Sequence, residues 1–151
     1  MPNVLIIYHS QSSKVRQMAD RVAHGVVQEV GVDLRCLEAF DADADDLRWC
    51  DGLIIGSPEN FGYMAGAIKD FFDRTFYEVL DEQLNLPYAL FIGAGNDGTG
   101  ASREIQRIVN GFPFRLVAEP LIVNSDLTDA YLLDCQELGH AMAAGMSLKI
   151  F

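Results

Sequence analysis

The sequence predicts an α/β fold in which a parallel sheet is covered by helices on both faces. Short apolar runs rich in branched residues alternate along the chain with longer segments whose apolar residues recur every three or four positions. Strands that are apolar throughout are typical of a parallel sheet buried on both sides. Five strand–helix units use nearly the whole length, so we expect residues 1–151 to form a single domain.

The first half of the chain supplies three of the expected strands and two helices. Residues 4–8 form a continuous apolar run, and helical spacing follows from Ser13 until Gly31, which is well placed to end a helix. Residues 32–37 and 52–56 are the next two short apolar runs, and both are expected to be strands. Helical spacing then returns at Met64, Ile68, Phe71, Phe72 and Phe76.

The second half of the chain continues the alternation. Residues 87–92 are predicted to form a strand headed by a proline, where a missing N–H does least harm. Residues 101–112 follow with helical spacing. The fifth strand is expected over residues 116–123, bent near Pro120, and the last helix over residues 128–145.

The charge balance argues against two classes of partner. The chain has 22 acidic and 11 basic residues, so its formal net charge is -11. Such a surface repels nucleic-acid phosphates and anionic lipid headgroups, and we expect neither nucleic acid nor a membrane as a partner. Residues 38–51 carry many of the acids and are expected to form a solvated loop and the start of a helix.

The cysteines and the N-terminus bear on the compartment. Cys36, Cys50 and Cys135 are too widely spaced for a CxxC pair or a Cys/His metal site, so we predict reduced thiols in a cytoplasmic protein and no bound metal. The first apolar run has no basic residues before it and is too short for a signal peptide or a membrane span.

Ligands of open parallel sheets bind beyond the carboxyl ends of the strands. Three segments occupy that edge: residues 9–14, 57–63 and 93–100. The first is rich in hydroxyls and enters a helix N-terminus, where backbone N–H groups favour a phosphate. Ser13 could equally be an ordinary N-cap, and Lys14 either neutralises a phosphate or is solvated.

The other two loops suit a flat polar ring. After a Ser-Pro expected to form a turn, Phe61 and Tyr63 flank Gly62, so aromatic side chains could stack on a ring that the backbone approaches closely. The third loop is rich in glycine, which leaves its N–H groups open to a ligand, and Asn96 can both donate and accept hydrogen bonds.

The third loop also contains a dinucleotide-binding pattern of three glycines. Gly93, Gly95 and Gly98 have the required spacing between a strand and a helix, and Glu119 lies near the position of a ribose-binding acid. A Rossmann half needs two further strands after this motif, whereas the remaining residues contain one convincing strand. We therefore reject this interpretation.

Two stretches carry a family resemblance. Residues 56–75, GSPENFGYMAGAIKDFFDRT, and residues 8–19, YHSQSSKVRQMA, resemble the ring loop and phosphate loop of the flavodoxin-like FMN proteins. Within this superfamily the pattern is most similar to the tryptophan-repressor-binding-protein type of NAD(P)H:quinone oxidoreductases and the NADPH-dependent FMN reductase group. The resemblance implies a flavodoxin-like three-layer sandwich with a five-stranded parallel sheet of order 2-1-3-4-5.

The resemblance also implies FMN as the cofactor and assigns its binding residues. The phosphate would be surrounded by Ser10, Gln11, Ser12, Ser13, Lys14 and Val15. The isoalloxazine ring would be lined by Pro58, Glu59, Asn60, Phe61, Gly62 and Tyr63, and its other side closed by Ala94, Gly95, Asn96, Asp97 and Gly98. Glu59 departs from the family in placing an acid near the ring, where an ionised carboxylate would disfavour the anion of the reduced flavin.

Three functions follow from these observations. The first is an FMN oxidoreductase that passes electrons from NAD(P)H to a quinone or another small acceptor, with the flavin and no catalytic side chain carrying the chemistry. The second is a flavodoxin-type electron carrier for a redox partner protein, which the small size and acidity favour. A flavin-free receiver domain ranks last because His9 and Ser10 stand where it needs two acids. The sequence is compatible with a homo-oligomer as well as with a monomer.

Overall fold

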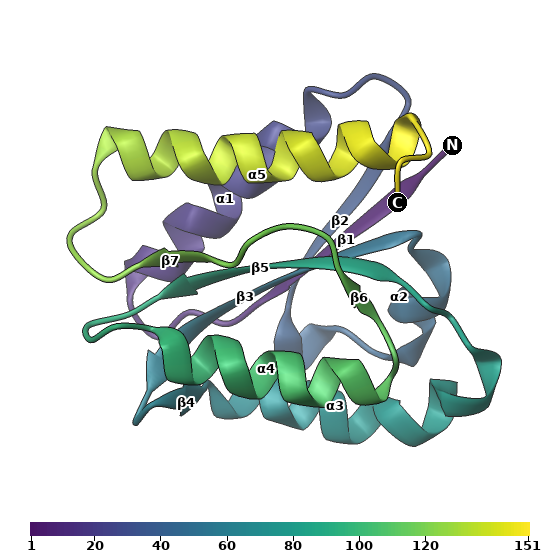
Figure 1. Ribbon diagram of the computed structural model, residues 1–151, viewed down its shortest axis with the longest axis horizontal. Helices are drawn as coiled ribbons and strands as arrows, with labels where there is room; N and C mark the ends of the chain where they lie inside the picture. The colour runs from purple at the N-terminus through teal and green to yellow at the C-terminus, as the bar shows by residue number, and fades with distance from the viewer.

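The computed structural model describes residues 1–151, and its central feature is a parallel sheet (Figure 1). The strands run in the order β2-β1-β3-β5, and β6 and β7 both pair with the outer side of β5. Every pairing among them is parallel. In chain order they are β1 (Asn3–Tyr8), β2 (Asp33–Glu38), β3 (Gly52–Asn60), β5 (Pro87–Gly93), β6 (Arg115–Leu116) and β7 (Leu121–Val123).

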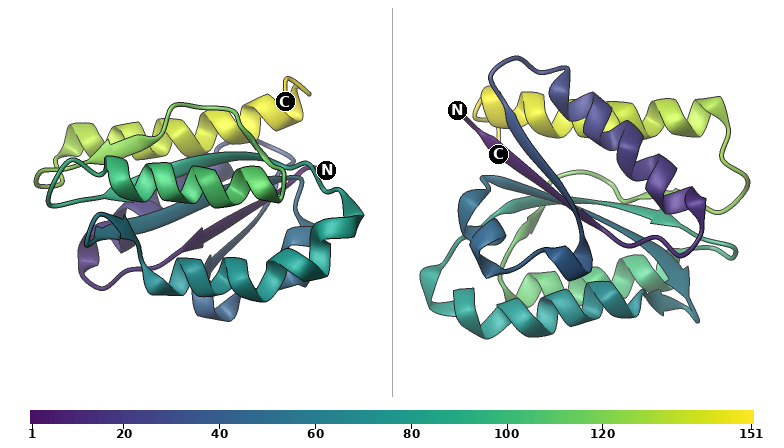
Figure 2. Two further views of the ribbon diagram at one scale, coloured as in Figure 1. Left: turned by 60° about the horizontal axis from the view of Figure 1, so that its bottom comes forward. Right: turned by 180° about the vertical axis from the view of Figure 1, so that it is seen from behind.

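Helices cover both faces of the sheet, as Figure 2 shows from two further sides. One face carries the pair of helices at the two ends of the chain, and the other face carries the three helices from its middle. The first pair is α1 (Ser13–Val27) and α5 (Asp129–Ser147). The second layer consists of α2 (Ala44–Trp49), α3 (Gly66–Val79) and α4 (Thr99–Gly111), with short turns η1 (Ala39–Asp41) and η2 (Leu80–Glu82).

The two layers explain why the central strands are apolar throughout. In β1, Val4 and Ile6 face α1 and α5, whereas Leu5 and Ile7 face the opposite core. All four are at most 1% exposed. Burying such a side chain stabilises the fold by about 1.5 to 3 kcal/mol, so a polar residue at any of these positions is costly. The predicted α/β sandwich of order 2-1-3-4-5 is confirmed.

The fifth strand differs from the prediction. Residues 116–123 do not form one bent strand, because the chain leaves the sheet between β6 and β7. β6 pairs with the beginning of β5 at Pro87 and Tyr88, and β7 pairs with its end. Pro120 lies in the gap between these two strands, where the backbone N–H that proline lacks is not needed for strand pairing.

β2 is the other strand whose environment differs from expectation. It is an edge strand paired only with β1, and Arg35 and Cys36 are exposed rather than buried. The acidic segment after it does begin a helix. Asp43 accepts hydrogen bonds from the N–H groups of Asp45 and Asp46, and Asp46 accepts one from Asp43 N at 3.0 Å, which completes a capping box for α2.

Two glycines allow α1 and α5 to lie in close contact across one face. A Cβ atom at Gly25 would lie 1.9 Å from the carbonyl oxygen of Gln136, and one at Gly139 would lie 2.0 Å from that of Val22. These neighbours are backbone atoms of the facing helix, which cannot rotate away. No helix of the protein has the length and apolarity that a membrane crossing requires.

We predict that Gly139→Ala lowers the free energy of unfolding by about 1 to 3 kcal/mol, because the added methyl group forces α1 and α5 apart. Gly66→Ala is the matched control, since a Cβ there meets no atom within 4 Å. The free energy of unfolding of the control should lie within about 1 kcal/mol of the wild-type value. Urea unfolding followed by circular dichroism measures both, and equal stabilities of the two variants would contradict the packing argument.

Candidate functional site

The three predicted loops meet at the carboxyl edge of the sheet, on the left in Figure 1. Strand pairing brings them together: Tyr8 is in register with Gly56, and Pro58 with Gly93. The N–H of His9 also donates to the carbonyl oxygen of Gly56 at 3.2 Å. Residues separated by more than eighty positions in the chain therefore border one surface.

The first loop presents a row of open backbone donors at the start of α1. The N–H groups of residues 11–15 donate to no acceptor within the protein. Ser12 occupies the N-cap position with an extended backbone, and its hydroxyl makes no capping hydrogen bond. Ser10 is engaged instead, since its Oγ accepts from the N–H of Arg16 at 3.2 Å and donates to the carbonyl oxygen of Ser12. The result is an anion-binding geometry at the positive end of a helix.

Lys14 lies in this loop but turns away from the open donors. Its Nζ donates to the carbonyl oxygens of Ala94 at 3.1 Å and Ser125 at 2.8 Å. Partial burial lowers the pKa of Lys14, and the nearby Asp126 opposes this shift. The lysine thus links the first loop to the third loop and to the segment after β7.

The second loop is a β-hairpin, which the sequence interpretation missed. Ser57 and Pro58 do not turn the chain, because β3 continues through Asn60 and then pairs antiparallel with β4 (Tyr63–Met64). The two-residue turn between them has positive φ angles at Phe61 (54°) and Gly62 (71°), as a type I′ turn requires. The usual sequence of such a turn is Asn-Gly, but here the two turn residues are Phe61 and Gly62, and Asn60 lies in the preceding strand.

Buried Ser57 fastens this hairpin. Its hydroxyl donates to the carbonyl oxygen of Pro58 at 2.7 Å and accepts from the N–H of Ala65 at 3.0 Å. The hairpin is tied to the first loop by Asn60, whose Nδ2 donates to the Oε1 of Gln11 at 2.6 Å. Sequence reasoning treated Ser57 only as a turn former, although a serine directly after a buried strand was a usable signal.

The two aromatic residues of the hairpin differ in exposure. Phe61, at the tip, is fully exposed, whereas Tyr63 is half-buried. A phenylalanine held at positive φ without any protein neighbour buries none of its apolar surface, so it contributes nothing to the core. It is available to cover a flat ligand at this edge.

Glu59 joins the hairpin to the third loop. Its carboxylate accepts hydrogen bonds from the N–H groups of Gly98 at 3.2 Å and Ala101 at 3.0 Å. These donors begin α4, whose N-cap residue is Gly98 and therefore has no capping side chain of its own. The negative charge also lies at the positive end of the helix, which is favourable. The carboxylate placed beside a ring by the family resemblance thus has a structural partner in α4.

Gly100 completes the contact between hairpin and helix. A Cβ atom at this position would lie 2.1 Å from the carbonyl oxygen of Gly62. The sequence analysis places Gly100 in the glycine-rich third loop, residues 93–100. The structure instead assigns it to helix packing in the first turn of α4.

The third loop combines a fixed start with an exposed centre. Ala94 is buried, and its N–H donates to the carbonyl oxygen of Val123 at 2.9 Å. Asn96 and Asp97 are exposed. Asp97 accepts hydrogen bonds from the N–H and hydroxyl of Thr99, and these bonds lower the pKa of Asp97. The side chain of Asn96 remains free to contact a ligand.

His9 is the remaining polar residue at this edge. Its Nδ1 lies 3.7 Å from the carboxylate of Glu38 and has no hydrogen-bond partner, although it is buried. Its ring contacts the edge of Phe40, with 6.1 Å between centroids. The ring therefore packs against β2 and η1.

The fold and this open edge define a flavodoxin-like α/β protein. Residues 2–123 match the family model described as NADPH-dependent FMN reductase. The chain therefore belongs to the NADPH-dependent FMN reductase family, and the predicted family resemblance is confirmed. The family match supports FMN as cofactor.

Individual relatives include both carriers and reductases. A flavodoxin of Aquifex aeolicus is 32% identical over 100 residues, which cover 66% of this chain and 54% of that protein. An NAD(P)H dehydrogenase (quinone) of Acidithiobacillus ferrooxidans is 35% identical over 95 residues, covering 50% of this chain and 48% of that protein. The chain spans about half the length of these curated relatives.

A solved structure agrees with the fold. A flavodoxin from the domain Archaea superposes with a TM-score of 0.83 at 20% identity, and the match covers 96% of this chain and 99% of the other.

We predict that Glu59→Gln lowers the free energy of unfolding by about 1 kcal/mol, because the amide removes the charge and one of the two acceptors at the start of α4. Glu119→Gln is the control, since Glu119 is exposed and has no ion pair or hydrogen bond. Thermal and urea unfolding of both variants measure the difference. If the two variants were equally stable, Glu59 would not act as the cap.

Proposed function

We propose that this chain binds FMN at the carboxyl edge of its sheet and acts as an oxidoreductase that passes electrons from NAD(P)H to a quinone or a similar small acceptor. The observation that supports this most directly is the row of unpartnered N–H groups at residues 11–15. When bound, FMN supplies the hydride and electron chemistry, so no side chain has to act as a nucleophile or an acid.

The first loop would hold the phosphate. The backbone N–H groups of Gln11 to Val15 have no acceptor within the protein, and Ser12 and Ser13 add hydroxyls to the same segment. Ser10 supports the loop from within, as its hydroxyl is already bonded. Because Lys14 is committed to carbonyl oxygens, the helix dipole and the N–H groups would carry the neutralisation without a side-chain cation.

The hairpin and the third loop would hold the ring. Phe61 would cover it from the hairpin side, with Pro58, Asn60, Gly62 and Tyr63 around it. From the other side, Gly95, Asn96 and Asp97 are exposed between buried Ala94 and Gly98, so their backbone is open to the polar edge of a ligand. Glu59 and Lys14 would act indirectly, by fixing the loops relative to one another.

The flavodoxin-type carrier remains the second candidate. The Aquifex aeolicus relative is a flavodoxin, and the net charge of -11 suits an encounter with a basic redox partner. In this function the chain would bind FMN by the same loops but would have no turnover of its own. The three free thiols, at Cys36, Cys50 and Cys135, support a reducing compartment such as the cytoplasm for either function.

We predict that Ser13→Pro weakens FMN binding by about tenfold to a hundredfold, since it deletes one phosphate-facing N–H of the charge-assisted kind. The fold should tolerate the change. Proline suits the first position of a helix, and Ser12 already has the extended backbone (φ -118°, ψ 178°) that proline imposes on its predecessor.

Two controls isolate the N–H. Ser13→Ala removes the hydroxyl but keeps the N–H, and it should bind FMN more tightly than the proline variant. Riboflavin, which lacks the phosphate, should bind equally to both. Fluorescence titration of the flavin gives the dissociation constants, and unchanged FMN affinity in Ser13→Pro would refute the phosphate site.

A second prediction separates the two functions. The FMN-loaded protein should oxidise NADPH continuously when a benzoquinone is supplied, as followed by the loss of NADPH absorbance. A protein that holds FMN but shows no turnover, and is instead reduced by a basic reductase in a salt-sensitive manner, would be a carrier.

A further inference from the structure

A polar groove runs along α4, beginning where the third loop ends. Its volume is 470 Å³, and it lies between the outer side of α4 and Ile122 of β7. The helix contributes Thr99, Arg103, Gln106, Arg107 and Asn110, which recur at helical spacing along one side. Thr99 directly follows the loop that would border the flavin ring. The groove therefore begins next to the third loop of the proposed site.

The two arginines of this groove are weakly engaged. The side chains of Arg103 and Arg107 are 70% and 81% exposed, and their only ionic contacts are with Glu104 at 3.5 Å and 3.9 Å. By contrast, Arg48 and Arg74 each hold a carboxylate at 2.6 Å. Arg103 and Arg107 thus share a single carboxylate, so the pair keeps one positive charge in excess. In a chain of net charge -11, two neighbouring guanidinium groups with a net positive charge form a local site for an anion.

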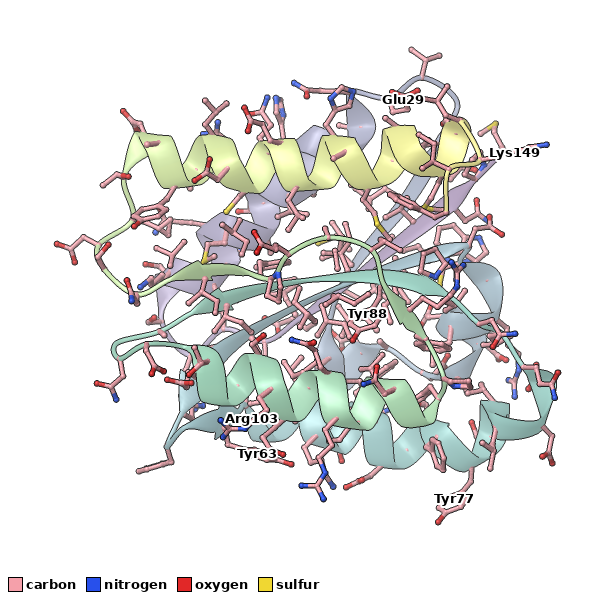
Figure 3. All side chains as sticks on the ribbon, in the orientation of Figure 1. Glu29, Tyr63, Tyr77, Tyr88, Arg103 and Lys149 are labelled. Atoms are coloured by element: carbon pink, nitrogen blue, oxygen red, sulfur yellow. The ribbon has the colours of Figure 1, made fainter.

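The distance along the helix fits an extended ligand. With a rise of about 1.5 Å per residue, Arg103 lies about 6 Å and Arg107 about 12 Å beyond Thr99. Figure 3 shows Arg103 projecting from α4 at the end of the molecule that carries Tyr63, and α4 and β4 are in contact. A ligand whose reactive end reaches the ring would therefore place its far end on these arginines.

The start of α4 offers no competing anion site. Glu59 already accepts hydrogen bonds from the N–H groups of Gly98 and Ala101, and its own negative charge would repel a phosphate there. Negative groups of a ligand that enters the groove can be neutralised only further along the helix, at Arg103 and Arg107.

We propose that Arg103 and Arg107 bind the 2′-phosphate of NADPH and thereby make the protein prefer NADPH over NADH. Guanidinium groups suit this role because they form paired hydrogen bonds with phosphate oxygens and stay charged. Gln106 and Asn110 supply amides for the adjoining ribose. The inference rests on the proposed function, because it assigns the electron donor to the same edge of the sheet.

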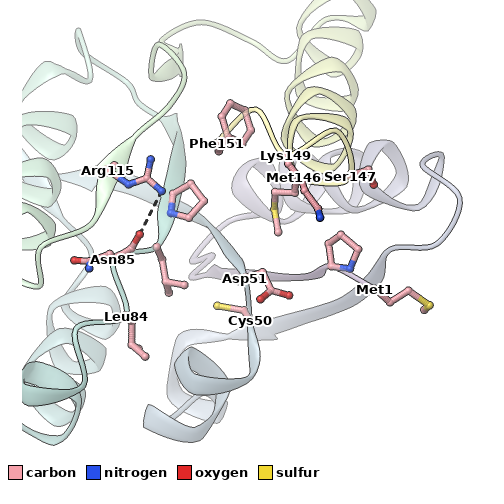
Figure 4. A pocket seen from close by; sticks show the side chains of 13 residues that line it. Met1, Cys50, Asp51, Leu84, Asn85, Arg115, Met146, Ser147, Lys149 and Phe151 are labelled. Carbon is pink, nitrogen blue, oxygen red and sulfur yellow. Dashed lines mark hydrogen bonds between the residues drawn. The ribbon is translucent and has the colours of Figure 1, made fainter.

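A second pair of cations provides a matched control. Arg115 and Lys149 line a larger hollow of 770 Å³ at the opposite edge of the sheet (Figure 4). Arg115 donates there to the carbonyl oxygen of Asn85 at 3.4 Å. Replacing this pair by glutamine changes the net charge as much as replacing the groove arginines, but at the far end of the strands from the three loops.

The test compares the double variant Arg103→Gln/Arg107→Gln with Arg115→Gln/Lys149→Gln and wild type. Calorimetric titration with 2′,5′-ADP should show binding to wild type and to the control pair, weakened at least about tenfold in the groove variant. Titration with 5′-AMP, which lacks the 2′-phosphate, should not distinguish the proteins. With FMN-loaded protein, the groove variant should have a raised KM for NADPH, with kcat and the KM for NADH unchanged.

The outcomes separate this inference from the proposed function. If wild type does not bind 2′,5′-ADP, or if all three proteins bind it equally, the inference is wrong even when NADPH is oxidised. An equal loss in both double variants would mean a general charge effect and would also overturn it. If only the groove variant binds 2′,5′-ADP more weakly and wild type oxidises no NADPH, the phosphate site is supported and the proposed reductase function is wrong.

Discussion

The parallel pairing of β3 between β1 and β5 is the constraint on which the rest of the structure depends. It aligns the ends of three strands, so that loops distant in the chain border one surface. Strand pairing alone leaves those loops free to move relative to one another. Polar side chains then fix them: Lys14 and Asn60 join the first loop to the third and to the hairpin, and Glu59 joins the hairpin to α4. The three loops of the site are therefore held in place by these hydrogen bonds, which are made to backbone groups and to a side-chain amide.

This arrangement separates positioning from recognition. Lys14 and Glu59, the charged residues among the predicted ligand-binding residues of the first two loops, form hydrogen bonds with other parts of the protein. The groups that remain free to bind a ligand are mainly backbone N–H groups and the exposed Phe61. Backbone donors cannot rotate away, so an anion that binds them meets a site that is already organised. A site of this kind needs no excess of positive side chains, which agrees with a strongly acidic chain that nonetheless belongs to an FMN reductase family.

The sequence predicted the layers of the fold because they follow from burial. Apolar runs and helical spacing report directly which residues face a core, and the order of the sheet followed from the motif around residues 56–75. The sequence predictions are wrong where a residue's structural role depends on a contact with a residue far away in the chain. The role of Glu59 depends on a helix forty residues later, and the hairpin at Phe61 depends on Ser57 and Ala65 rather than on a turn motif. The bend predicted near Pro120 is instead a break between two strands.

That break has a consequence for association in concentrated solution. An edge strand with a continuous row of free N–H and C=O groups can template strands of other molecules. Here the outer side of β5 is covered by segments of only two and three residues, offset from one another, so no long row is presented. The opposite edge, β2, is six residues long but carries Asp33, Arg35 and Glu38. Both edges of the sheet are thus protected against intermolecular β-pairing, one by interruption and the other by charge.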